Sequence, residues 1–253
     1  MKHAIRALGW ATAVFWILVI LFSVTVVYSA MQIRMNRVEE EPEVTYSNGA
    51  ITMSIPFSIS NGGLYDISEL NITTHVVAEN ETVSRTTTQV PTISRGDTAN
   101  ETYDISVSLD HILANLTYML FIDTDLEVEI SVALTYAHAI PLKISHNETL
   151  QWGAPFYNLS INIPPVSPQP ANASVSFENH AFFGLNGTIG LQIMDSSGEL
   201  IGSGTTDRFY VPPRAPSTSL QVTIIGDLGD MAEVHLYFYT SVFSFGPVVM
   251  SFD

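Results

Sequence analysis

The chain begins with a long apolar run and continues as alternating apolar and polar residues. No residue from Ala7 to Ile33 is charged, and the stretch from Trp10 to Tyr28 is almost wholly apolar. About 20 helical residues, each rising 1.5 Å, cover the roughly 30 Å hydrocarbon core of a bilayer. Trp10 and Tyr28 lie at the ends of this stretch, where amphipathic rings favour the interface. The pattern predicts a transmembrane helix over residues 7–33 after a short basic cytoplasmic tail, residues 1–6.

Three fates of this helix are open from the sequence. An uncleaved anchor is favoured, because the apolar core of a cleaved signal peptide is only about 7–15 residues long. Cleavage between Ser29 and Ala30 is the second fate, since small residues flank that bond. The third is an archaeal type IV pilin, whose N-terminal helix forms a filament core; Arg6–Gly9 loosely resembles a prepilin cleavage site.

Residues 34–47 follow as a predicted acidic stalk. The helix is expected to run on through Arg34–Arg37 towards Glu39–Glu41 and to end at Pro42, because the residue before a proline avoids the helical region.

From Ala50 the hydrophobic period becomes two, which indicates strands. The longest such pattern places Val128, Ile130, Val132, Leu134 and Tyr136 on one face. Residues 48–163 are therefore predicted to form a β-sandwich.

One stretch of this region has helical spacing instead. Leu109–Leu120 carries its apolar residues on one stripe, with Asp110 as the expected N-cap. We expect Ile112, Leu113 and Leu116 to pack this short helix against the sandwich.

After a proline-rich linker over residues 164–172, the sequence repeats the first domain over residues 173–253. Five segments match: Phe57–Asn61 with Val175–Asn179, Leu70–Val76 with Gly187–Ile193, Val90–Pro91 with Val211–Pro212, Glu127–Val132 with Glu233–Phe238, and Pro141–Ser145 with Pro247–Ser251. The second copy is shorter where the first has its helix, and the glycines of Ile225–Asp230 predict a tight turn there. The predicted fold class is mainly β, with two tandem fibronectin-III- or immunoglobulin-like sandwiches.

The charge is strongly acidic, with 25 Asp and Glu against nine Lys and Arg. Every acidic residue follows Val38, so the acidity belongs to the part beyond the helix. This argues against nucleic acid or anionic lipid as a partner. There is no cysteine, which excludes disulfides, thiolate metal sites and a cysteine nucleophile. A prokaryotic surface is favoured, because secreted eukaryotic domains of this size usually carry disulfides.

Eight sites fit the glycosylation pattern Asn-x-Ser/Thr, whereas about two or three would arise by chance. They are Asn71, Asn80, Asn100, Asn115, Asn147, Asn158, Asn172 and Asn186. All lie on the C-terminal side of the helix, which predicts a single-pass cell-membrane protein with extracellular C-terminal domains. The sequons and the missing cysteines together favour an archaeal cell surface.

Asn61 after an apolar strand, the amphipathic insert and the long alternating strand with its proline-containing partner resemble the LEA-2 or WHy (water stress and hypersensitive response) domain. The Trp152–Pro155 segment is similar to that of archaeal members. The resemblance covers residues 48–163 well and 173–253 more weakly. It implies a fibronectin-III-like sandwich and an association with desiccation stress, and it brings no catalytic residues.

No catalytic, cofactor or metal motif is found in the sequence, so an enzyme is not expected. The acidic turns Asp123–Asp125 and Asp227–Asp230 are interpreted as solvated rather than as calcium loops. The aromatic loop Gln151–Leu159 is interpreted as a plug at the end of the sandwich, with a carbohydrate-binding platform as the alternative.

The predicted function is that of a non-catalytic, N-glycosylated surface protein in a structural, accessory or stress-protective role. The alternatives are a pilin-like filament subunit and a surface module that binds carbohydrate or protein. The expected partners are the lipid bilayer, through the N-terminal helix, and other proteins or further copies of the chain at the cell surface.

Overall fold

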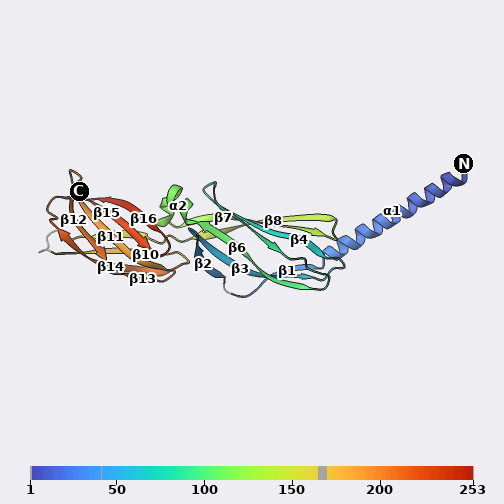
Figure 1. Ribbon diagram of the computed structural model, residues 1–253, viewed down its shortest axis with the longest axis horizontal. Coiled ribbons are helices and arrows are strands. Elements are labelled where there is room, and N and C mark those ends of the chain that lie inside the picture. Colours follow the sequence, from blue (N-terminus) through green and yellow to red (C-terminus); the bar gives the residue numbers. More distant parts are fainter. Residues whose placement is uncertain (1, 41, 165–169, 253) are drawn as a thin grey trace.

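The computed structural model describes residues 2–40, 42–164 and 170–252. It is mainly β, as predicted, with one long apolar helix at the N-terminus and one short α-helix in the first sandwich. Figure 1 shows an elongated molecule in which α1 projects from one end, followed by the first sandwich and then the second.

Helix α1 spans Lys2–Ala30, so most of the predicted cytoplasmic tail is helical. The prediction that the helix runs on to Pro42 is wrong. The chain turns at Met31 and Gln32 and becomes strand β1 (Ile33–Arg37), because Ile33 packs against the core of the first sandwich. Strand β2 (Glu43–Ser47) follows, and both strands pair with β3. The predicted stalk over residues 34–47 therefore contains two edge strands of the sandwich.

The first sandwich has two four-stranded sheets. In one, β3 (Ala50–Asn61) pairs with β1 and β2 along one edge and with β6 (Thr98–Ser108) along the other. The second sheet has the order β5 (Glu81–Val90), β4 (Ile67–Ala78), β7 (Thr124–Tyr136) and β8 (Ile140–Trp152). The alternation in β4 is nearly complete, with every second residue buried from Leu70 to Ala78.

The predicted helical insert is present as α2 (Leu109–Asn115) followed by a 3₁₀ turn, η1 (Thr117–Leu120). The N-cap is Ser108, whose hydroxyl accepts from the His111 N–H, and not Asp110, which lies in the first turn. Ile112 and Leu116 are buried as expected, whereas Leu113 is only half-buried.

The second sandwich is one eight-stranded sheet that folds over on itself. One part contains β9 (Tyr157–Asn162), β10 (Ala171–Asn179) and β14 (Ala215–Gly226). The other contains β11 (Leu185–Asp195), β13 (Phe209–Val211), β15 (Met231–Thr240) and β16 (Ser244–Ser251). Strand β12 (Leu200–Thr206) pairs with both β11 and β14 and so joins the two parts. β9 belongs to this sheet although the sequence predicts residues 157–162 as part of the first sandwich. Residues 165–169 of the predicted linker lie outside the described residues.

The register of the strands tests the predicted repeat. Ile72 pairs with Val132 in the first copy, and Ile189 pairs with Phe238 in the second, as the alignment requires. The expected tight turn of the second copy is also present, between Gly226 and Met231.

Two of the five matches are wrong. Leu70 pairs with Val90 whereas its match Gly187 pairs with Phe209, so Val90 corresponds to Phe209 and not to Val211. Glu127 pairs with Thr149 and Glu233 pairs with Ser251, so Ser251 does not correspond to Ser145. The β7–β8 hairpin of the first copy is longer than the β15–β16 hairpin of the second. Pro141–Ser145 and Pro247–Ser251 therefore lie at different positions along their hairpins.

Candidate functional site

The C-terminal end of α1 is packed into the first sandwich. Val26 and Ser29 are buried, and together with Phe22 and Ala30 they form one stripe of the helix. The Ser29 hydroxyl forms a hydrogen bond with the Tyr136 hydroxyl, and it accepts a second one from the Leu64 N–H at 2.5 Å. The helix and the sandwich therefore share one small core.

The loop between β3 and β4 holds the side of the helix. The Tyr65 ring lies 5.9 Å from the Phe22 ring, edge to face, and the Tyr65 hydroxyl is 3.2 Å from the Thr25 hydroxyl. A Cβ atom at Gly63 would lie 2.2 Å from the Tyr136 hydroxyl oxygen and 2.7 Å from the Ser29 Oγ atom. Only glycine therefore leaves room for the helix at this point.

At its other end, the first sandwich is joined to the second through Trp152. Its side chain is fully buried, and its indole N–H donates to the Met119 carbonyl at 2.9 Å. Phe182 and Phe183 of the second sandwich each lie 5.8 Å from the indole ring. This confirms the interpretation of the aromatic loop as a plug. A carbohydrate platform on Trp152 is wrong, because no face of the ring is accessible.

Phe156 continues the plug into the second core. It is fully buried, and its ring lies 5.1 Å from Phe177 and 4.3 Å from Phe238. One hydrophobic core consequently runs from the α2 end of the first sandwich through the second.

A charged clamp closes the same joint. His180 Nδ1 lies 2.8 Å from Asp123 Oδ2, and His180 Nε2 lies 2.9 Å from Glu178 Oε2. Since both ring nitrogens face carboxylates, the doubly protonated imidazolium fits, because only that form donates from both. The hydrogen bond to Asp123, followed by that to Glu178, raises the pKa of His180 above its ordinary value. The hydrogen bond from His180 lowers the pKa of Glu178.

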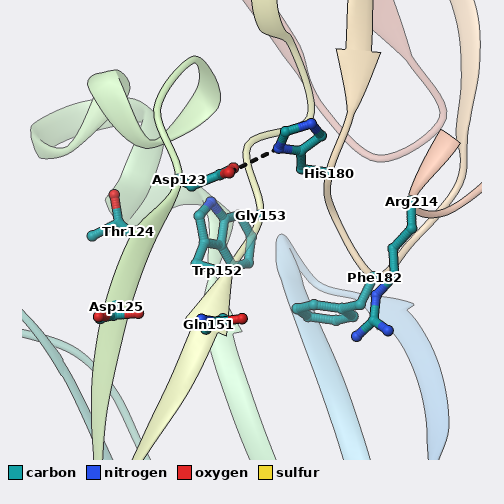
Figure 2. Close-up of a pocket in the computed structure, with 9 residues that line it drawn as sticks. All are labelled: Asp123, Thr124, Asp125, Gln151, Trp152, Gly153, His180, Phe182 and Arg214. Carbon is teal, nitrogen blue, oxygen red and sulfur yellow. Dashed lines mark hydrogen bonds and ion pairs between the residues drawn. The ribbon is translucent and has the colours of Figure 1, made fainter. Parts of the chain in front are cut away.

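The clamp borders a polar pocket of about 370 Å³ at the joint (Figure 2). Its lining is Asp123, Thr124, Asp125, Gln151, Trp152, Gly153, His180, Phe182 and Arg214. Asp123 already binds both His180 and the Ala154 N–H, so it braces the joint. Among the described residues, no group of three or more His, Cys, Asp or Glu side chains could hold a metal ion.

The eight sequon asparagines are spread over both sandwiches, and none of them is buried. Six are exposed, and Asn71 and Asn186 are half-buried. By contrast, the two buried asparagines, Asn61 and Asn179, are not in sequons. Asn158 lies next to the clamp, where its side-chain amide donates to Glu178 Oε1 at 3.1 Å.

The sequence did not single out His180 or Tyr136 as contact residues. His180 follows Asn179 at the position that Gly62 holds in the first copy. This difference between the two copies is the sequence feature that could indicate a special role for His180. In the sequence, Tyr136 has the pattern of an ordinary inward residue of an alternating strand. No local feature indicates that it contacts Ser29 of α1.

The sequence matches no protein-family model and no curated protein. Among solved structures, red sea bream transglutaminase aligns with a TM-score of 0.30 and 13% identity over 87% of this chain and 31% of its own. Amycolatopsis orientalis exo-chitosanase CsxA aligns with a TM-score of 0.28 and 11% identity over 84–85% of this chain and 26–27% of its own. The chain thus spans under a third of these two proteins.

A third alignment is with the Salmonella enterica SafA pilin in complex with the SafB chaperone. Its TM-score is 0.23 and its identity 15%, over 87% of this chain and 95% of that one. Similarity this low carries no functional inference.

Proposed function

We propose that this chain is a non-catalytic, single-pass surface protein that keeps its N-terminal helix as a membrane anchor and holds two joined sandwiches outside the cell. The apolar segment Gly9–Ala30 has 22 residues, and an 18-residue stretch within it has a mean hydropathy of 2.4, enough to cross a bilayer. The two sandwiches, with their common core, form the arm that the anchor carries.

The observation that carries the proposal is the burial of Val26 and Ser29 in the first sandwich. Cleavage after Ser29 would remove both side chains from the folded protein. It would leave the Tyr136 hydroxyl and the Leu64 N–H without the partner that Ser29 provides, and an unpaired buried polar group costs about 1–3 kcal/mol. A helix used only for secretion has no need of such a socket.

The surface of the arm supports the rest of the proposal. Six of the eight sequon asparagines are exposed and two are half-buried, so a glycosylating enzyme has access to them, which fits an extracellular arm. The clamp residues beside the pocket at the joint hold the two sandwiches together, which supports a structural or accessory role. The resemblance to LEA-2 domains would make that role protective during desiccation.

Intact mass and N-terminal sequencing of the protein from native membranes test the proposal. We expect a mature chain that retains residues 10–29, resists carbonate extraction and carries glycan on at least some sequons. A mature chain that starts at Ala30 would refute the anchor. A chain that starts at Trp10 and is recovered in filaments would instead establish the pilin-like alternative. That cleavage is compatible with the structure, since it leaves the Ser29 contacts intact.

A further inference from the structure

The loop that holds α1 exposes an apolar side chain beside the membrane helix. Leu64 is 57% exposed, and residues 61–65, which include it, carry no charge. The helix itself stays apolar on its free side along the sandwich, where Val24, Val27, Tyr28 and Met31 are 61–76% exposed. Something apolar has to cover both surfaces.

The second sandwich shows what becomes of the equivalent loop. Asn61 corresponds to Asn179, so Leu64 corresponds to Phe182 three residues further on. Phe182 packs against Trp152, which belongs to the body that precedes its sandwich. The body that precedes the first sandwich is the membrane helix with its surrounding lipid, and Leu64 beside this helix is 57% exposed.

The depth of the loop follows from the helix geometry. A hydrocarbon core of about 30 Å, counted from Arg6, ends about 20 residues later, near Val26. The headgroup region adds about 5–7 Å on each side, which extends the interface to about Met31. The residue after Met31 is the polar Gln32, and Arg34 is the first charged residue after the helix. Tyr65 lies beside Phe22 and Thr25, which both precede Val26. Its loop therefore lies at the edge of the hydrocarbon core or just inside it.

We infer that the loop Gly62–Tyr65 is inserted in the outer leaflet, with Leu64 at the boundary between headgroups and acyl chains, so that the first sandwich sits on the bilayer surface. The occupant of this apolar surface is lipid. Leucine and tyrosine suit that position, since apolar side chains bury there and a tyrosine ring is amphipathic. The inference rests on the proposed membrane anchor.

Labelled single cysteines test this, because the chain has no cysteine of its own. Leu64→Cys, Ile122→Cys and Val14→Cys are each made in the full chain, labelled with an environment-sensitive fluorophore and reconstituted in phosphatidylcholine vesicles. Ile122 is the matched control: it is also apolar and 57% exposed, but it lies at the far end of the first sandwich. Val14, within the apolar segment and 51% exposed, reports the anchor.

We expect the label at residue 64 to emit at shorter wavelength than that at residue 122 and to be quenched by lipids that carry a nitroxide near the headgroup. A label at residue 64 that behaves like that at residue 122, while residue 14 is in lipid, would overturn the inference and leave the anchor intact. A label at residue 14 that stays in water would refute the anchor itself. If Leu64→Cys does not fold, Met31→Cys reports the same boundary from the helix, and exposure of that label to water would equally overturn the inference.

Discussion

Asn61 and Asn179 occupy the same position in the two sandwiches and make the same three hydrogen bonds. Each is fully buried at the end of a strand, and each side-chain amide donates to the carbonyl four residues later, Tyr65 or Phe183, at 2.9 Å. The Asn61 amide also donates to the Ile93 carbonyl, just after β5, and the Asn179 amide donates to the Pro212 carbonyl, just after β13. Each side-chain oxygen accepts from the N–H two residues later. These two residues fix the loops that receive α1 and Trp152.

Replacing either asparagine by alanine should therefore destabilise the protein. Either change removes three side-chain hydrogen bonds from a buried loop. The Tyr65 or Phe183 carbonyl and the N–H two residues after the asparagine lose their side-chain partner, whereas the Ile93 carbonyl keeps its bond from the Ile67 N–H. We expect a loss of about 1–3 kcal/mol in the free energy of unfolding for each. Chemical denaturation measures it. Asn162→Ala is the control, since Asn162 is exposed and should change stability by less than about 0.5 kcal/mol. Equal effects at residues 162 and 179 would refute the role of the buried amide.

The sequence predicts the strands and the repeat well, because one buried face of a sheet imposes a period of two that is legible residue by residue. Ile72 and Ile189 could be aligned for this reason. The residues that join the bodies could not be found this way. Ser29 is one small polar residue in an apolar helix, and its partner Tyr136 lies 107 residues away, so no local pattern connects them.

The failure at residues 34–47 has a related cause. The charged residues of this stretch suggest a solvated stalk, but a strand at the edge of a sheet keeps much of its surface in solvent. It therefore tolerates charges such as Arg34 in β1 and Glu43 in β2. β2 is exposed along its whole length and still pairs with β3. The pairing of such a strand depends on its partner, which composition does not indicate.

A double-mutant cycle tests the coupling of the helix to the sandwich. Ser29→Ala in the full chain should cost about 1–3 kcal/mol of unfolding free energy, since it leaves the Leu64 N–H and the Tyr136 hydroxyl unpaired. Tyr136→Phe should cost less, because Ser29 keeps its bond from Leu64. We expect the two changes together to cost less than their sum, with a coupling of about 0.5–1.5 kcal/mol. Additive effects would mean that the two hydroxyls do not interact.

The control for that cycle is Ser23→Ala, on the same helix. Its hydroxyl donates to the Val19 carbonyl and is exposed, so it contacts no part of the sandwich. Ser23→Ala is combined with Tyr136→Phe, and the unfolding free energies are measured by denaturation in detergent micelles. The effects of these two changes should add.

The clamp at His180 should make the joint sensitive to pH. The pKa of His180 is raised in the folded protein, so its contribution is complete below the ordinary value of 6.5 and is lost as the pH rises through the raised value. The pKa of Glu178 is lowered, so its contribution is present above the ordinary 4.5 and is lost as the pH falls through the lowered value. The clamp is therefore strongest in the window between these two ordinary values.

His180→Gln measures this contribution. We expect it to destabilise the protein by about 1 kcal/mol near pH 5.5 and by clearly less near pH 9, where the wild-type imidazole is neutral. His146→Gln is a suitable control, because His146 is exposed. A destabilisation by His180→Gln that is the same at both pH values would show that the charge on His180 does not hold the joint.

The short helix α2 offers a matched pair of neighbours with different burial. Ile112 is fully buried in the core that runs through both sandwiches, whereas Leu113 is half-buried at its margin. From the sequence, Leu113→Asp is expected to unfold the first sandwich, because a buried carboxylate would have no partner. Because Ile112 is the more deeply buried of the two, the structure predicts the larger loss of stability for Ile112→Asp.

Ile112→Asp should abolish folding of the full chain, since a carboxylate there is removed from water on all sides, and loss of the Ile112 contacts alone costs about 2–5 kcal/mol. Leu113→Asp can turn its carboxylate to solvent and should cost less, about 1–3 kcal/mol. Far-UV circular dichroism and denaturation compare the two. Because one core continues into the second sandwich through Trp152 and Phe156, we expect Ile112→Asp to lower the stability of that sandwich as well. If the second sandwich kept its full stability, the joint would be weaker than its packing indicates.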